Sequence, residues 1–252
     1  MKNFICFLII ALSAISMSGC TSFDKFATEK RLASANQDRV QSADTSLEKP
    51  FKLGILLDLE TTGSPGEYHR DWSWDDYEQK MITSYADSLV KEGAVSGYFF
   101  IPEGNVPLQD LNAVMKKAVE NKADALLTVR GVISVDKYMN PFGILDPTII
   151  GALVLPGSNM DVAILVHLDL WDLKNQKSLV SLKSDGVRKD VGTTLFIRTD
   201  SANTENAVSD VKIETLRTLL IDFKKKFTGI RFQAGPPSYP KNEKPLGFSD
   251  GK

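Results

Sequence analysis

Residues 161–186 read DVAILVHLDLWDLKNQKSLVSLKSDG, and this stretch decides the fold. Apolar residues alternate along its first half, as in a strand whose side chains point to opposite sides in turn. One side would carry only aliphatic residues: Val162, Ile164, Val166, Leu168 and Leu170. The other would be mixed: Ala163, Leu165, His167, Asp169 and Trp171. A polar turn at 173–177 and a second strand at 178–188 then complete a predicted β-hairpin.

The residues before the hairpin alternate between strand and helix patterns. Short apolar runs predict strands at residues 51–59, 94–101 and 124–135. Between them, apolar residues at helical spacing predict helices at residues 74–92 and 107–121. The resulting order β-α-β-α-β favours a parallel sheet covered by helices.

The first of these helices has a predicted start, buried face and end. Ser73 is the predicted N-cap and Asp76 its capping-box partner, while Gly93 suits the helix end. The predicted buried face comprises Trp74, Tyr77, Met81, Tyr85 and Leu89.

Two further apolar segments flank the hairpin. Residues 148–155 form a run interpreted as a strand, and residues 201–227 repeat apolar side chains with a helical period. The predicted fold class is therefore α/β (α+β). One mixed sheet covered by helices is expected in a single domain over residues 51–228, ending in a long C-terminal helix.

The ends of the chain read as non-globular. Residues 1–19 combine Lys2, an apolar run and small residues, the order of a secretory signal peptide. Residues 20–50 are polar and are predicted to form a flexible tether, and residues 229–252 a disordered tail rich in proline and glycine. With Cys6 in the leader, Cys20 is the only other cysteine.

Met17-Ser18-Gly19-Cys20 resembles a bacterial lipobox. The resemblance implies that Cys20 carries acyl chains and becomes the first residue of the mature protein, which would be anchored to a membrane without spanning it. Thr21 follows, where an Asp would resemble an inner-membrane retention signal, so the expected location is the outer membrane, facing the periplasm.

The hairpin itself resembles that of the periplasmic α/β lipoprotein superfamily that includes CsgG, LpoB and the TolB N-terminal domain. A closer resemblance is to the rhombotail type of lipoprotein, in Ile149-Ile150-Gly151-Ala152, Pro156-Gly157 and Leu170-Trp171-Asp172. The chain departs from that type at its end, PLGFSDGK, which lacks an apolar sorting tail. The resemblance implies envelope assembly, regulation or export through protein contacts, and it brings no catalytic residue.

The sequence offers weak signals for chemistry. His69 lies among carboxylates without metal-ligand spacing, and His167 shares a strand face with Asp169. Gly63-Ser64-Pro65-Gly66 lacks the lysine of a P-loop. We expect no catalytic residue, cofactor or metal site, and the net charge of −2 argues against nucleic-acid binding.

The expected function is therefore a non-catalytic binding or assembly factor, anchored in the membrane and partnered by an envelope protein. Four aromatic residues could contact that partner: Tyr68, Trp72, Tyr138 and Phe142. For Trp72, packing against the sheet is the alternative role. Two other functions stay open, a subunit of an oligomeric secretion complex and a hydrolase with an unrecognised site; the oligomeric state is left open as well.

Overall fold

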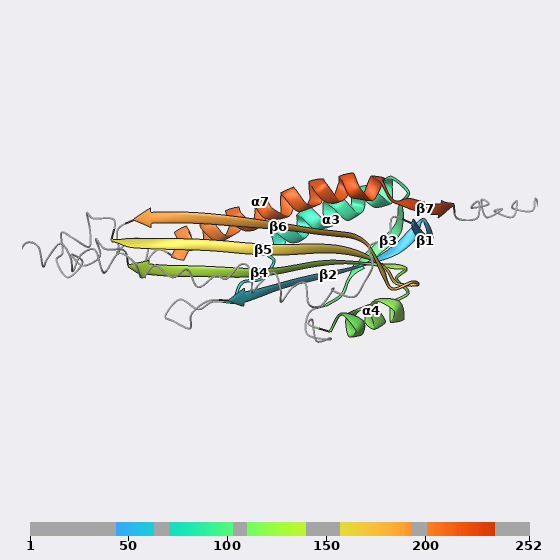
Figure 1. Cartoon of the computed structure of the whole chain (residues 1–252), viewed down its shortest axis with the longest axis horizontal. Coiled ribbons are helices and arrows are strands. Elements are labelled where there is room, and N and C mark those ends of the chain that lie inside the picture. Colours follow the sequence, from blue (N-terminus) through green and yellow to red (C-terminus); the bar gives the residue numbers. More distant parts are fainter. Residues whose placement is uncertain (1–43, 63–70, 103–109, 140–156, 193–200, 235–252) are drawn as a thin grey trace, which may run out of the picture.

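The protein forms one mixed sheet with helices on both faces (Figure 1). This computed structural model describes residues 44–62, 71–102, 110–139, 157–192 and 201–234. The elements are β1 (Asp44–Lys49), β2 (Phe51–Thr62), α3 (Asp76–Lys91), β3 (Val95–Phe100), α4 (Leu111–Glu120), β4 (Ala125–Met139), β5 (Ser158–Asp172), β6 (Lys177–Gly192), α7 (Ser201–Thr228) and β7 (Arg231–Ala234). Their order confirms the predicted fold class, including the β-α-β-α-β start, the hairpin and the long C-terminal helix.

Five strands build the main sheet in the order β3-β2-β4-β5-β6. The first three are parallel, whereas β4, β5 and β6 are antiparallel. The hairpin is longer than predicted, because β6 continues to Gly192. On its other side, the whole of β5 pairs with β4. The predicted strand at residues 148–155 lies outside the described residues.

The two faces of the sheet are covered differently. Helices α3 and α7 pack on one face, against the aliphatic side of β5 that alternation predicts. Helix α4 packs on the other face near one end of the sheet, against Leu56, Leu126 and Trp171. Figure 1 shows α7 and α3 together on one side of the strands and α4 on the other.

Helix α3 begins later than predicted. Its predicted buried face is confirmed at Trp74 and Leu89, which are buried, and at Met81 and Tyr85, which pack against the core, but it is wrong at one residue. The N-cap is Asp75 rather than Ser73, and the capping-box partner is Glu78 rather than Asp76, with the amide of Asp75 donating to Glu78 Oε2 at 2.9 Å. Tyr77, predicted to be buried, is 54% exposed. The buried positions are Glu78, Ile82, Ala86 and Leu89. An inward carboxylate would not be expected from an apolar pattern, and its partner on α7 explains it.

Lys212 of α7 is that partner, and its side chain is fully buried. The ammonium donates to the Ser73 carbonyl at 2.9 Å and to Asp75 Oδ2 at 2.6 Å, and lies 3.3 Å from Glu78 Oε1. A buried charge costs several kcal/mol unless charge and hydrogen bonds compensate it, and here two hydrogen bonds and the ion pair with Glu78 do so. The start of α3 is therefore joined to the middle of α7.

Gly186 lets α7 approach the sheet closely. A Cβ built on Gly186 would overlap Thr215 Oγ1 and lie 2.9 Å from Val211 Cγ1, both on α7. Only a residue without a side chain fits between β6 and the helix at this distance.

The folded part extends beyond the predicted limits of 51–228 at both ends. Strand β1 lies within the predicted tether and β7 within the predicted tail, and the two pair in parallel as a separate sheet. The Phe232 ring of β7 stacks on the Phe51 ring, with 5.8 Å between the ring centroids, and its centroid lies 5.3 Å from that of Phe227. Lys49 Nζ of β1 lies 4.0 Å from the centre of the same ring. The two ends of the domain thus hold each other.

A truncation experiment tests this correction. A chain that stops after Ile230 loses β7 and the Phe232 ring, whereas one that stops after Gly235 keeps both. We expect the shorter chain to lose about 2 kcal/mol or more of unfolding free energy, from the buried aromatic area and ring pairing. The longer chain should unfold at the same denaturant concentration as the full chain. Equal stability of the two truncated chains would show that the β1–β7 pair contributes nothing.

The Lys212 network gives a second prediction. Lys212→Met should cost about 3–5 kcal/mol, because it leaves the fully buried Glu78 carboxylate without its cation. Adding Glu78→Gln removes that charge and keeps an acceptor for the amide of Asp75, so the double variant should recover much of the loss in urea unfolding. A double variant as unstable as the single one would show that the cost arises from packing.

Candidate functional site

A row of polar side chains crosses the face of the sheet opposite α3 and α7. Asp58 of β2 is paired with Arg130 of β4, Arg130 with His167 of β5, and His167 with Lys183 of β6. Because directly paired residues of adjacent strands point to the same side, these four side chains form one row across four strands. We call it the polar row.

Burial and an ion pair shape the first half of the polar row. Arg130 Nε lies 3.6 Å from Asp58 Oδ2, and both side chains are largely buried. Burial raises the pKa of the Asp58 carboxyl, and the nearby Arg130 guanidinium acts in the opposite direction. Burial is the larger of the two effects, so this carboxyl takes up a proton more readily than an exposed aspartate does.

The neighbouring positions are also polar and buried. Thr128, Asp169 and Ser181 form the next row toward α4, and the first two are about 1% exposed. The structure places His167 and Asp169 on the same face, as the alternation predicts. Two steps along a strand span roughly 6.6 Å, so the two side chains lie in adjacent rows.

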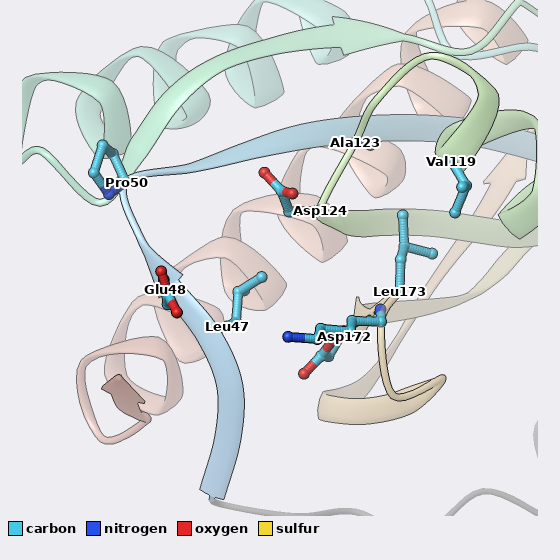
Figure 2. A pocket seen from close by; sticks show the side chains of 9 residues that line it. Leu47, Glu48, Pro50, Val119, Ala123, Asp124, Asp172 and Leu173 are labelled. Carbon is cyan, nitrogen blue, oxygen red and sulfur yellow. Dashed lines mark hydrogen bonds between the residues drawn. The ribbon is translucent and has the colours of Figure 1, made fainter. Parts of the chain in front are cut away.

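A pocket of about 570 Å³ lies at the end of the sheet nearest β1 (Figure 2). Its apolar lining includes Leu47, Val119 and Leu173, and its charged lining Glu48, Asp124, Asp172 and Lys174, with Pro50 and Ala123 completing it. Figure 2 shows Leu47 and Glu48 projecting from β1 on one side of the pocket and Val119 and Leu173 on the other.

Two of the pocket carboxylates are already engaged with backbone groups. Asp124 Oδ2 accepts from the amide of Lys52 at 2.8 Å. Asp172 Oδ1 accepts from the amides of Lys174 and Asn175 at 3.0 and 3.2 Å, which fixes the hairpin turn. These carboxylates hold the walls of the pocket in place.

The predicted partner-binding aromatics are only partly described. Tyr68 and Phe142 lie outside the described residues, as do His69, Gly63–Gly66 and the lipidation candidate Cys20. Trp72 is half-buried against the core under α3 and α7, and its amide donates to Thr61 Oγ1 at 2.8 Å. Tyr138 points to the opposite face of the sheet, where its hydroxyl lies 3.2 Å from Asp161 Oδ2. The structure therefore does not bring Trp72 and Tyr138 together.

Sequence reasoning missed Asp58, Arg130 and Lys183. A signal was present for the first two: each is a charged residue inside an apolar strand, in FKLGILLDL and DALLTVRGVISV. A charge within a buried strand needs a partner, and the parallel register of β2 and β4 supplies it.

The described ranges contain neither a candidate metal cluster nor a candidate membrane-spanning helix. No group of three or more histidine, cysteine, aspartate or glutamate side chains there could hold a metal ion. Over the same residues, no helix has the length and apolar content needed to cross a membrane.

No protein-family model matches the chain, and no curated protein matches its sequence significantly. Several solved structures are similar to it, among them a neuraminyllactose-binding hemagglutinin homolog from Helicobacter pylori, at 11% identity and a TM-score of 0.37, with 74% of this chain and 90% of that chain covered. The C-terminal domain of LpoB from Escherichia coli aligns at 10% identity and a TM-score of 0.30, over 56% of this chain and 85% of its own. Lipoprotein GNA1162 from Neisseria meningitidis aligns at 17% identity and a TM-score of 0.27, over 62% and 97%. The similar structures thus include bacterial lipoproteins, and at these TM-scores they carry no argument about this chain's activity.

The raised pKa of Asp58 gives a pH prediction. A carboxyl whose pKa is higher in the folded protein stabilises it below the ordinary pKa of about 4, and this contribution is lost as the pH rises through the folded pKa. The stability of the wild type relative to Asp58→Asn should therefore fall between pH 4 and neutrality in denaturant unfolding.

Arg130→Met serves as the second arm of this measurement. Without the guanidinium that lowers the pKa of Asp58, the fall with pH should be larger. A relative stability that instead rises with pH would show that Arg130 outweighs burial and that the row holds a firm ion pair.

Proposed function

We propose that this chain is a lipid-anchored protein of the bacterial cell envelope that faces the periplasm and acts by binding another protein, without catalysis. The observation that carries the proposal is the leader that ends in Met17-Ser18-Gly19-Cys20. An acylated Cys20 would hold the folded domain at a membrane surface, because each buried methylene of an acyl chain contributes about 0.8 kcal/mol. Thr21 favours the outer membrane, and the rhombotail resemblance of the hairpin agrees with this location.

The pocket beside β1 supports a binding role. Leu47 on one side and Val119 and Leu173 on the other make the lining partly apolar, and Glu48 adds a carboxylate beside Leu47. A side chain with an apolar stem and a cationic head, as in lysine or arginine, matches this lining. Such a side chain would come from a protein partner, since the pocket lies at the end of the sheet with Val119 53% exposed beside it.

The rival hydrolase function rests on His167 and Asp169. They share a polar face, where Arg130 and Lys183 are paired with His167 and the hydroxyl residues Thr128 and Ser181 are paired with Asp169, so no hydroxyl side chain is paired directly with the histidine. We therefore propose a structural role for the polar row and a partner-binding role for the pocket.

Site-specific crosslinking in intact cells tests the proposal. A photoreactive residue at Val119 should capture a protein of the envelope, and Glu48→Lys should abolish that product. Cys20→Ala should release the chain from the detergent phase and reduce the product as well, because the domain is no longer held at the membrane. Cys6→Ala, a change in the leader, should leave both readouts unchanged.

The control probe belongs at Ile221, which is 52% exposed on α7, away from the pocket. Equal products from Val119 and Ile221 would refute the pocket as the binding site. Partition that is unaffected by Cys20→Ala would refute the anchor.

A further inference from the structure

The last strand of the main sheet, β6, is a long edge. It has 16 residues, and within the described part of the chain it has a neighbouring strand, β5, on one side only. The opposite edge, β3, has 6 residues. An edge strand presents a row of backbone donors and acceptors to the outside, and soluble proteins commonly keep such edges short. The length of β6 therefore needs a reason.

The outward side chains of β6 are mixed rather than uniformly charged. On the face away from α7, its exposed residues are Lys183, Asp185, Val187, Lys189 and Val191. Val187 and Val191 are 59% and 64% exposed. Residues of the other parity, such as Gly186, face α7. These side chains would lie beside those of a strand that paired with the backbone of β6.

We propose that β6 pairs with β6 of a second copy of this chain, antiparallel, with Val187 on the two-fold axis. Antiparallel pairing of an edge with itself requires an axis perpendicular to the sheet that passes beside one residue. With Val187 at the axis, the two Val187 side chains meet each other. Lys189 of each copy then lies opposite Asp185 of the other, and Val191 lies opposite Lys183.

Shifted registers are less favourable. An axis at Gly186 would place Lys183 against Lys189, and an axis at Asp185, Arg188 or Lys189 would place that charge against its own copy. An axis at Ser184 would pair Lys183 with Asp185, but it would set Lys189 against Leu179 and Val187 against Ser181. Charge pairing and apolar pairing coincide at Val187.

The ion pairing within one copy is compatible with this arrangement. Lys189 Nζ lies 3.9 Å from Asp161 Oδ2 of β5, and the lysine side chain is 65% exposed. A long exposed lysine between Asp161 and the Asp185 of the second copy can reach both carboxylates. The dimer would join two five-stranded sheets into one continuous sheet. The two antiparallel β6 strands would lie at its centre.

Cysteine crosslinking of the full chain in its native membrane tests the proposal. Val187→Cys should form a disulfide-linked product of twice the chain mass, since Cα atoms of paired strands lie about 4.5–5.5 Å apart, within disulfide range. Val90→Cys, which replaces a 37% exposed valine on α3, should stay monomeric. The wild type runs alongside, and Cys6 and Cys20 are common to all samples.

The charge pairing is tested in the Val187→Cys chain. Lys189→Asp should reduce the linked product several-fold, and adding Asp185→Lys should restore it, since the two charges are exchanged. A monomeric Val187→Cys chain, a product with a different protein, or equal linkage at Val90→Cys would overturn the proposal. An amount of linked product that neither charge change alters would overturn the proposed register. The anchor proposal does not bear on these outcomes, because partition of the chain is measured separately.

Discussion

The buried ammonium of Lys212 is the constraint on which the arrangement of the helices depends. A fully buried cation needs compensation within the protein, so its two hydrogen-bond acceptors and its ion-pair partner must be in place whenever the helices are packed. All three come from the start of α3: the carbonyl of Ser73 and the carboxylates of Asp75 and Glu78. Since Glu78 also accepts from the amide of Asp75, the same carboxylate caps α3 and binds α7. The capping of α3 and its packing against α7 therefore depend on the same carboxylate.

The start of α3 is linked in turn to the polar row on the other face of the sheet. Trp74 Nε1 donates to the Asp58 carbonyl at 3.0 Å, while the Asp58 side chain pairs with Arg130. Gly131, next to Arg130, leaves the space that the Trp74 ring occupies, because a Cβ there would lie 3.2 Å from Trp74 Cζ2. Adjacent residues of β4 thus serve opposite faces. The helical layer and the polar row hold the same segment of β2 and β4 in register.

Sequence alone predicts the parts of this fold that depend on local periodicity. Alternation in residues 161–171 assigns both faces of β5 correctly, and helical spacing finds α3, α4 and α7. The features it misses depend on distant partners. Tyr77 fits the apolar pattern of α3, yet the buried position belongs to Glu78, because its carboxylate pairs with Lys212 of α7. Strand β7 is four residues long and is specified by pairing with β1 and by the Phe51 and Phe227 rings, none of which a local window contains. The polar row likewise requires the register of four strands.

The β1–β7 pair also connects the ends of the chain to the candidate binding pocket. Leu47 and Glu48, which form one wall of the pocket, belong to β1, and β1 pairs with β7 rather than with the main sheet. The opposite wall, with Val119 and Leu173, belongs to α4 and to the residues that follow β5, which the core under α4 holds rigidly. One wall is therefore part of the main domain, and the other is held through the aromatic cluster of Phe51, Phe227 and Phe232. Leu47 of β1 and Phe232 of β7 both pack against the core of the main sheet, so the pocket wall formed by Leu47 and Glu48 depends on the β1–β7 pair and on that core together.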